Sequence, residues 1–69
     1  MLNEHDVVAL TEDLAADGLR KGDVGAIVHC YQVGAVYEVE FIDERGRTKG
    51  IATVPASQLM KLNLLSLTA

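Results

Sequence analysis

Three side chains in this sequence are metal ligands or nucleophiles by type: His5, His29 and Cys30. A closed structural zinc site takes four ligands from histidine, cysteine and carboxylate side chains. His29 and Cys30 are neighbours in a segment that predicts a β-strand, and successive side chains of a strand point to opposite faces. The two side chains would not hold one ion together, so the sequence predicts no metal site and no cofactor.

The candidate nucleophiles are Cys30, Ser57 and Ser66. Nucleophilic catalysis needs a base beside the nucleophile and a third group that orients the base. On the predicted strand, Cys30 shares a face with Val24 and Val28, where a free cysteine behaves as a small hydrophobic residue. We therefore expect Cys30 to pack in the core, and we expect no catalytic residue.

Two carboxylates, Glu38 and Glu40, stand two apart on one predicted strand and match the spacing of a general acid and base pair. Carboxylates are also common on the solvated face of a sheet. With Arg45, Arg47 or Lys49 on the following strand they would form cross-strand ion pairs of at most about 1 kcal/mol each. The second interpretation needs no pocket, and we expect the protein not to be an enzyme.

The charge balance points to proteins rather than nucleic acids as partners. The chain of 69 residues contains six lysine and arginine residues and ten aspartate and glutamate residues, which gives a net charge of −4. Nucleic-acid binding depends on neutralising phosphates, and the bases here are dispersed. The composition therefore disfavours a nucleic acid and favours a basic protein surface as partner.

The elements that must position these residues are strands separated by glycine turns. Alternating or β-branched apolar runs predict five short strands. These cover residues 6–10, 26–31, 36–41, 48–54 and 60–64. Residues 11–21 predict an ordered loop with one helical turn, or alternatively a short helix over 12–17 closed by Gly18.

Glycine and proline mark the turns between these strands. Gly34 and Gly46 lie in predicted turns, Gly22 allows a sharp entry into the second strand, and Gly25 allows another backbone to approach closely. Pro55 ends the fourth strand, and residues 56–59 fit a 3₁₀ turn. The pattern predicts an all-β fold, a small five-stranded SH3-like barrel forming a single domain over residues 1–69, with a strand-swapped version as an alternative.

Three stretches also carry a resemblance to a known family. These are Asp6-Val7-Val8-Ala9-Leu10-Thr11-Glu12-Asp13, Gly18-Leu19-Arg20-Lys21-Gly22-Asp23-Val24-Gly25-Ala26-Ile27-Val28 and Tyr37-Glu38-Val39-Glu40-Phe41. Across nearly the whole chain the sequence resembles the small bacterial domain-of-unknown-function family numbered 4926. The glycine layout is similar to SH3-like accessory domains such as that of the nitrile hydratase beta subunit. The resemblance implies an SH3-like fold and an antitoxin-like or immunity-like partner role, and it brings no catalytic residues.

The C-terminal segment is rich in leucine and is poorly explained by a lone monomer. A small domain without disulfides gains stability by oligomerising. We predict a homodimer whose interface includes Leu62, Leu64, Leu65 and Leu67, with pairing or swapping of the last strand. No apolar run is long enough to span a membrane, and the N-terminus lacks the pattern of a signal peptide, so we expect a cytoplasmic location.

The leading functional hypothesis is a self-associating protein-interaction module that also binds a basic or β-edged protein partner. Association with nucleic acid or the ribosome is an alternative, suggested by the turn Lys21-Gly22-Asp23-Val24-Gly25, which looks like turns in RNA-associated SH3-like domains. An accessory subunit of an enzyme encoded elsewhere is a third. Copurification and the salt dependence of binding separate the three.

Overall fold

The structure is a computed structural model that describes residues 2–32 and 34–63. Five antiparallel strands form one sheet in the order β4-β3-β2-β1-β5. Their bounds are β1 (Val7–Leu10), β2 (Val24–Gln32), β3 (Val36–Ile42), β4 (Thr48–Pro55) and β5 (Leu59–Lys61), with 3₁₀ turns η1 (Ala15–Asp17) and η2 (Ala56–Gln58). No α-helix occurs in the described residues, so the all-β prediction is confirmed.

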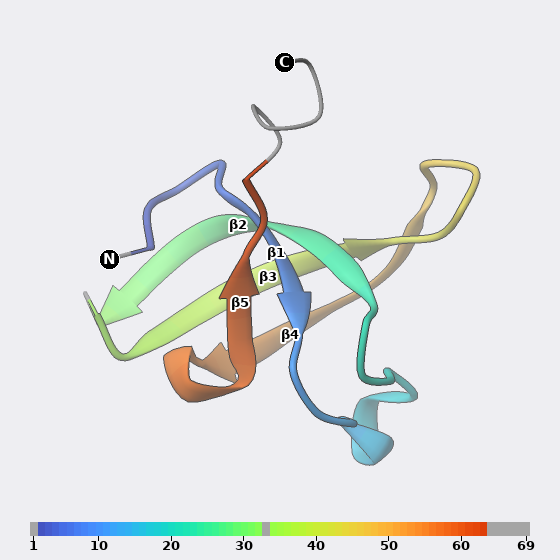
Figure 1. Cartoon of the computed structure of the whole chain (residues 1–69), viewed down its shortest axis with the longest axis horizontal. Helices are drawn as coiled ribbons and strands as arrows, with labels where there is room; N and C mark the ends of the chain where they lie inside the picture. The colour runs from blue at the N-terminus through green and yellow to red at the C-terminus, as the bar shows by residue number, and fades with distance from the viewer. Residues whose placement is uncertain (1, 33, 64–69) are drawn as a thin grey trace.

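The expected barrel is not closed by hydrogen bonds. Over residues 2–32 and 34–63 the sheet is open, with β4 and β5 as its two edges. The sheet nevertheless curls, and Figure 1 shows the result: β1 and β5 cross in front of β3 and β4. The side chains between these two parts form the core: Val8, Leu10, Leu19, Ile27, Tyr37, Val39, Phe41, Ala52, Val54 and Leu59.

Strand β3 shows the alternation that its sequence predicts. Tyr37, Val39 and Phe41 are fully buried, whereas Glu38 and Glu40 lie half-buried on the opposite face. Because side chains alternate along a strand, a slip of one residue would expose all three core side chains. The burial pattern therefore fixes the register of β3 against its neighbours.

Strand β2 contains an irregularity that the sequence analysis missed. The β2–β3 register shifts between Ile27 and His29, so that Ile27 lies opposite Val39 and Cys30 lies opposite Tyr37. An extra residue in one strand reverses the faces of the residues that follow it. Cys30 packs against the core as expected, but the predicted face, shared with Val24 and Val28, is wrong for this reason.

The segment before β2 is a loop that holds a single 3₁₀ turn, η1. Leu14 and Leu19 form an isolated antiparallel bridge around it, and Gly18 ends it in the left-handed conformation with φ of 70°. Leu19 is buried, and Leu14 packs against the core. The loop interpretation with one helical turn is thus confirmed, and these two leucines hold the loop to the sheet.

The last strand is shorter than predicted within the described residues. Strand β4 ends at Pro55, η2 follows directly, and β5 runs only from Leu59 to Lys61. The backbone of Leu62 still donates a hydrogen bond to the Val7 carbonyl at 2.9 Å, which continues the pairing with β1 by one residue. The predicted interface residues Leu64, Leu65 and Leu67 lie outside the described residues.

Candidate functional site

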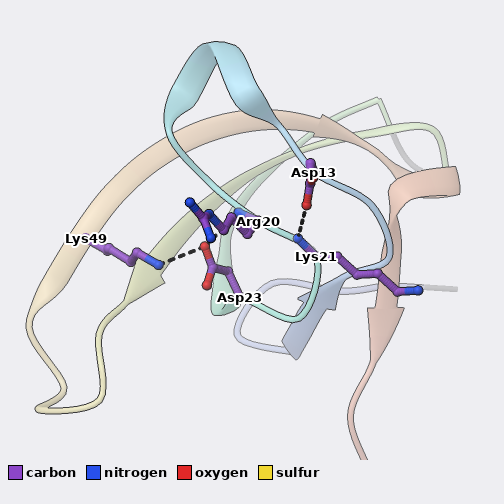
Figure 2. A network of polar contacts seen from close by, with 5 residues as sticks. All are labelled: Asp13, Arg20, Lys21, Asp23 and Lys49. Atoms are coloured by element: carbon purple, nitrogen blue, oxygen red, sulfur yellow. Dashed lines mark hydrogen bonds and ion pairs between the residues drawn. The ribbon is translucent and has the colours of Figure 1, made fainter.

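A network of polar contacts joins the first loop to β4, as Figure 2 shows. One carboxylate oxygen of Asp23 accepts hydrogen bonds from the Lys49 ammonium at 2.8 Å and from the Arg20 backbone N–H at 2.9 Å. These two donors, Lys49 first, hold the pKa of Asp23 below its ordinary value. Earlier in the loop, the Asp13 carboxylate accepts a hydrogen bond from the backbone N–H of Lys21 at 2.8 Å.

This network orders the loop, because its two carboxylates accept hydrogen bonds from backbone N–H groups and from Lys49. Two open surface depressions among the described residues lie beside it. One is lined by Asp13, Ala15, Gly18, Leu19, Arg20 and Lys21, and the other by Gly22, Asp23, Val24, Ile42, Asp43, Glu44 and Lys49. Most of their polar groups already bond to the backbone or to each other, so these depressions are weak candidates for a ligand site.

The four glycines singled out from the sequence hold different positions. Gly22, Gly34 and Gly46 lie in turns with φ of 91°, 80° and 78°, a region that other residues rarely adopt. Gly25 lies inside β2, where a Cβ atom would come within 2.5 Å of the Glu40 carbonyl oxygen. The close packing of β2 on β3 at this point therefore depends on the missing side chain.

We call the outward-facing surface of β2, β3 and β4 the acidic outer face. The register places Glu38 between His29 and Thr53, and Glu40 between Ala26 and Ile51. The Tyr31 side chain reaches Glu38 from the end of β2. Ile51 and Tyr31 are 58% and 54% exposed. The face therefore combines two carboxylates with two large, accessible side chains.

Hydroxyl groups, not cations, occupy these two carboxylates in the described part of the chain. The Tyr31 hydroxyl donates to Glu38, which raises the pKa of Tyr31, and the Thr48 hydroxyl donates to Glu40 at 2.6 Å. The expected cross-strand pairs with Arg45, Arg47 or Lys49 are thus wrong. Arg47 instead pairs with Asp43 at 3.6 Å in the β3–β4 turn, and Lys49 pairs with Asp23.

The outward-facing surface of β5, β1 and the start of β2 is different, and we call it the apolar outer face. Met60 lies opposite Ala9, which lies opposite Val24; Leu62 continues beside Val7, which lies opposite Ala26. Met60 is 53% exposed. Ala9 is only 6% exposed, although it lies outside the core cluster.

The histidine and cysteine side chains do not converge. His29 packs edge-on against the Tyr31 ring, with ring centroids 4.7 Å apart, while Cys30 turns inward opposite Tyr37. Within residues 2–32 and 34–63, no three side chains of the histidine, cysteine, aspartate and glutamate types are grouped for a metal ion. The same residues contain no helix with the length and apolar character to cross a membrane.

Sequence reasoning found Leu62 but missed most of the apolar outer face. A weak signal was present: Val7 and Ala9 alternate with the core residues Val8 and Leu10, and Met60 directly follows the core residue Leu59. The runs looked like buried strands, and only the pairing of β1 with β5 and β2 shows that these residues gather outside the core. Ile51 was missed for the same reason.

The fold and its surfaces define a class: a small all-β domain, built on one curled antiparallel sheet, with two contrasting outer faces. Within that class the family is known. Residues 4–61 match the family model described as Domain of unknown function (DUF4926), and the chain belongs to this family, as the resemblance indicated. No curated protein matches the chain, and neither does any solved structure.

Proposed function

We propose that the protein is a small, non-enzymatic interaction module that associates with itself through the apolar outer face. One observation carries the proposal: six apolar side chains gather outside the core cluster, on β1, the start of β2 and the segment from β5 to Leu62. Met60 is more than half exposed, Ala9 is buried, and the other four are half-buried. Contiguous exposed apolar surface on a small soluble domain marks a binding site more often than scattered apolar residues do.

The size of the domain supports a second copy as the occupant of this face. Within residues 2–32 and 34–63 the core cluster holds ten buried side chains, few for independent stability. Burying apolar surface between two copies would add to the stability. The apolar outer face carries no charged side chain, so two copies of a chain with net charge −4 can meet there without bringing carboxylates together. The homodimer predicted from the C-terminal leucines would use this face, since Leu62 belongs to it.

Two more specific versions of the proposal place another protein, and not a second copy, on the apolar outer face. An accessory subunit would cover the same face with its enzyme, and an antitoxin-like protein would cover it with its target. All versions place the module in the cytoplasm, where the single thiol of Cys30 stays reduced. Copurification with one specific protein would favour these versions over the homodimer.

The test is the mass in solution, measured by light scattering at tens of micromolar protein. We expect a dimer for the native chain and a monomer for Met60→Glu, because a carboxylate on the apolar outer face would be desolvated in the dimer. The matched control Met60→Leu keeps an apolar side chain and should remain a dimer. Circular dichroism checks that each variant is folded. A native chain that is monomeric throughout would overturn self-association.

A further inference from the structure

We propose that the free edge of β4 binds an extended, basic segment of another protein, which adds to the sheet as a sixth strand. The inference goes beyond the proposed self-association, because it uses a surface separate from the apolar outer face. It follows from three features of β4: an open edge, an exposed isoleucine and two neighbouring carboxylates.

The edge is open over a short, defined stretch. In the described residues β4 pairs only with β3, so its other side presents unpaired backbone groups. Proteins commonly protect such edges with lysine, proline or a bulge. In β4 these protective features lie only at the two ends of the strand. A register shift at Lys49 interrupts the pairing near its start, and Pro55 is its last residue. The residues between them, 50–54, carry none.

The side chains along this stretch select what can dock. Ile51 and Thr53 both point outward, beside Glu40 and Glu38 respectively. Neighbouring strands lie about 4.8 Å apart, so a residue opposite Thr53 on an added strand would lie roughly 10 Å from Glu38, measured between backbones. A long basic side chain can pass over the short Thr53 and reach that carboxylate. An apolar side chain fits opposite Ile51.

Charge complementarity decides the occupant. Glu38 and Glu40 have only hydroxyl partners in the described part of the chain, and the net charge of the whole chain is −4. A second copy pairing edge to edge would bring four such carboxylates onto one surface, and a nucleic acid would bring phosphates to them. A segment that carries an apolar residue and, two positions on, a lysine or arginine can contact Ile51 and a carboxylate at once, because alternate residues of a strand share a face.

Peptide binding tests this inference directly. The probe is a fluorescein-labelled octapeptide with the sequence Thr-Val-Thr-Lys-Thr-Val-Thr-Lys. The control peptide carries glutamate in place of each lysine. By fluorescence anisotropy we expect the lysine peptide to bind at least tenfold more tightly than the control, with affinity that falls as salt is added. Equal binding of the two peptides, or no binding of either, would overturn the inference.

Variants locate the site. Ile51→Lys should weaken binding at least tenfold, since it removes the apolar contact and repels the probe. Glu38→Gln should weaken it about three- to fivefold, the size expected of one exposed ion pair. The matched control Glu44→Gln changes the net charge equally but lies in the β3–β4 turn, and it should bind as the native chain does. Equal effects of the two glutamate variants would mean nonspecific attraction and contradict the site.

Light scattering on the same samples separates this inference from the proposed function. A dimer that fails to bind the peptide overturns only the β4 site. A monomer that binds it overturns only self-association, and a monomer that binds nothing overturns both. If Ile51→Lys instead converts a dimer to a monomer, the β4 edge is occupied by a second copy and the inference is wrong.

Discussion

The two edge strands of the sheet, β4 and β5, are built in opposite ways. Strand β5 has three residues, and it pairs with β1, whose outward-facing side chains Val7 and Ala9 are apolar. Strand β4 has eight residues, an exposed isoleucine at its middle and carboxylates beside it. A short edge offers few free backbone groups, whereas a long one offers a template for another strand.

This difference suggests a division of roles within one small sheet. The half that contains β5 offers apolar surface but little free backbone, which suits face-to-face contact between copies. The half that contains β4 offers backbone groups and charge, which suit an extended partner. The two halves share β2, whose first residues pair with β1 on one side and β3 on the other. Substitutions can therefore test the halves separately or together.

The largest effect is expected at Gly25, where the halves meet. This residue lies opposite Val8 in β1 and Phe41 in β3, and a Cβ atom there would approach the Glu40 carbonyl oxygen to 2.5 Å and Val39 to 2.9 Å. We expect Gly25→Ala to lower the free energy of unfolding by about 3 kcal/mol, because the β3 backbone at Glu40 must move away from β2. Urea denaturation measures it.

The control for this substitution is Gly50→Ala in β4. No atom lies within 4 Å of a Cβ added at Gly50, so the change should alter the free energy of unfolding by less than about 0.5 kcal/mol. Similar losses for the two alanine variants would mean that the close approach at Gly25 does not constrain the sheet.

A smaller effect is expected in the β4 half alone. The buried Tyr37 hydroxyl accepts a hydrogen bond from the Gly34 backbone N–H at 2.9 Å and so fastens the β2–β3 turn. Tyr37→Phe should lower the free energy of unfolding by about 1 kcal/mol, since the ring still fills the core but the N–H loses its partner. Tyr31→Phe removes an exposed hydroxyl and should cost much less; thermal unfolding of both variants compares them.

The two edge lysines give a direct comparison of the edges. The Lys49 ammonium lies 2.8 Å from Asp23, and the Lys61 ammonium lies 3.6 Å from Asp6 with a more exposed side chain. We expect Lys49→Met to lower the free energy of unfolding by up to about 1 kcal/mol, and Lys61→Met to leave it nearly unchanged. A larger loss at Lys61 in chemical denaturation would reverse the ranking of the edges.

The smallest effect is a pH dependence carried by Asp23. Its pKa is lowered in the folded protein, chiefly by the hydrogen bond from Lys49, so ionised Asp23 stabilises the fold above its ordinary pKa of 3.8. That contribution is lost as the pH falls through the lower, folded-state pKa. The stability difference between the native chain and Asp23→Asn should therefore shrink as acid is added below pH 4. A difference that stays constant with pH would exclude this contact as its source.

Much of the fold was predictable because local patterns agree with it. The alternation of Tyr37, Val39 and Phe41 with two glutamates predicted β3 and its buried face correctly. Pro55 marked the end of β4 because proline cannot donate a ladder hydrogen bond, and the 3₁₀ turn followed as expected. The loop before β2 was also predicted, since its leucines are isolated among polar residues.

The site was less predictable, because it depends on which strands pair and in which register. The ion pairs expected for Glu38 and Glu40 failed because Lys49 turns to Asp23, which is 26 residues away in sequence. The face of Cys30 was wrong because the irregularity after Ile27 reverses the alternation. Neither event leaves a mark in the local composition.

The sequence by itself determined the class of the fold, the positions of most strands and the net charge of −4, since these depend on local periodicity, turn residues and composition. Tertiary structure decided which apolar residues entered the core and which gathered outside it as the apolar outer face. It also decided that β4 lies at an edge with Ile51 exposed. Edges and faces are properties of strand pairing between distant segments, and pairing is set by the free energy of the whole core.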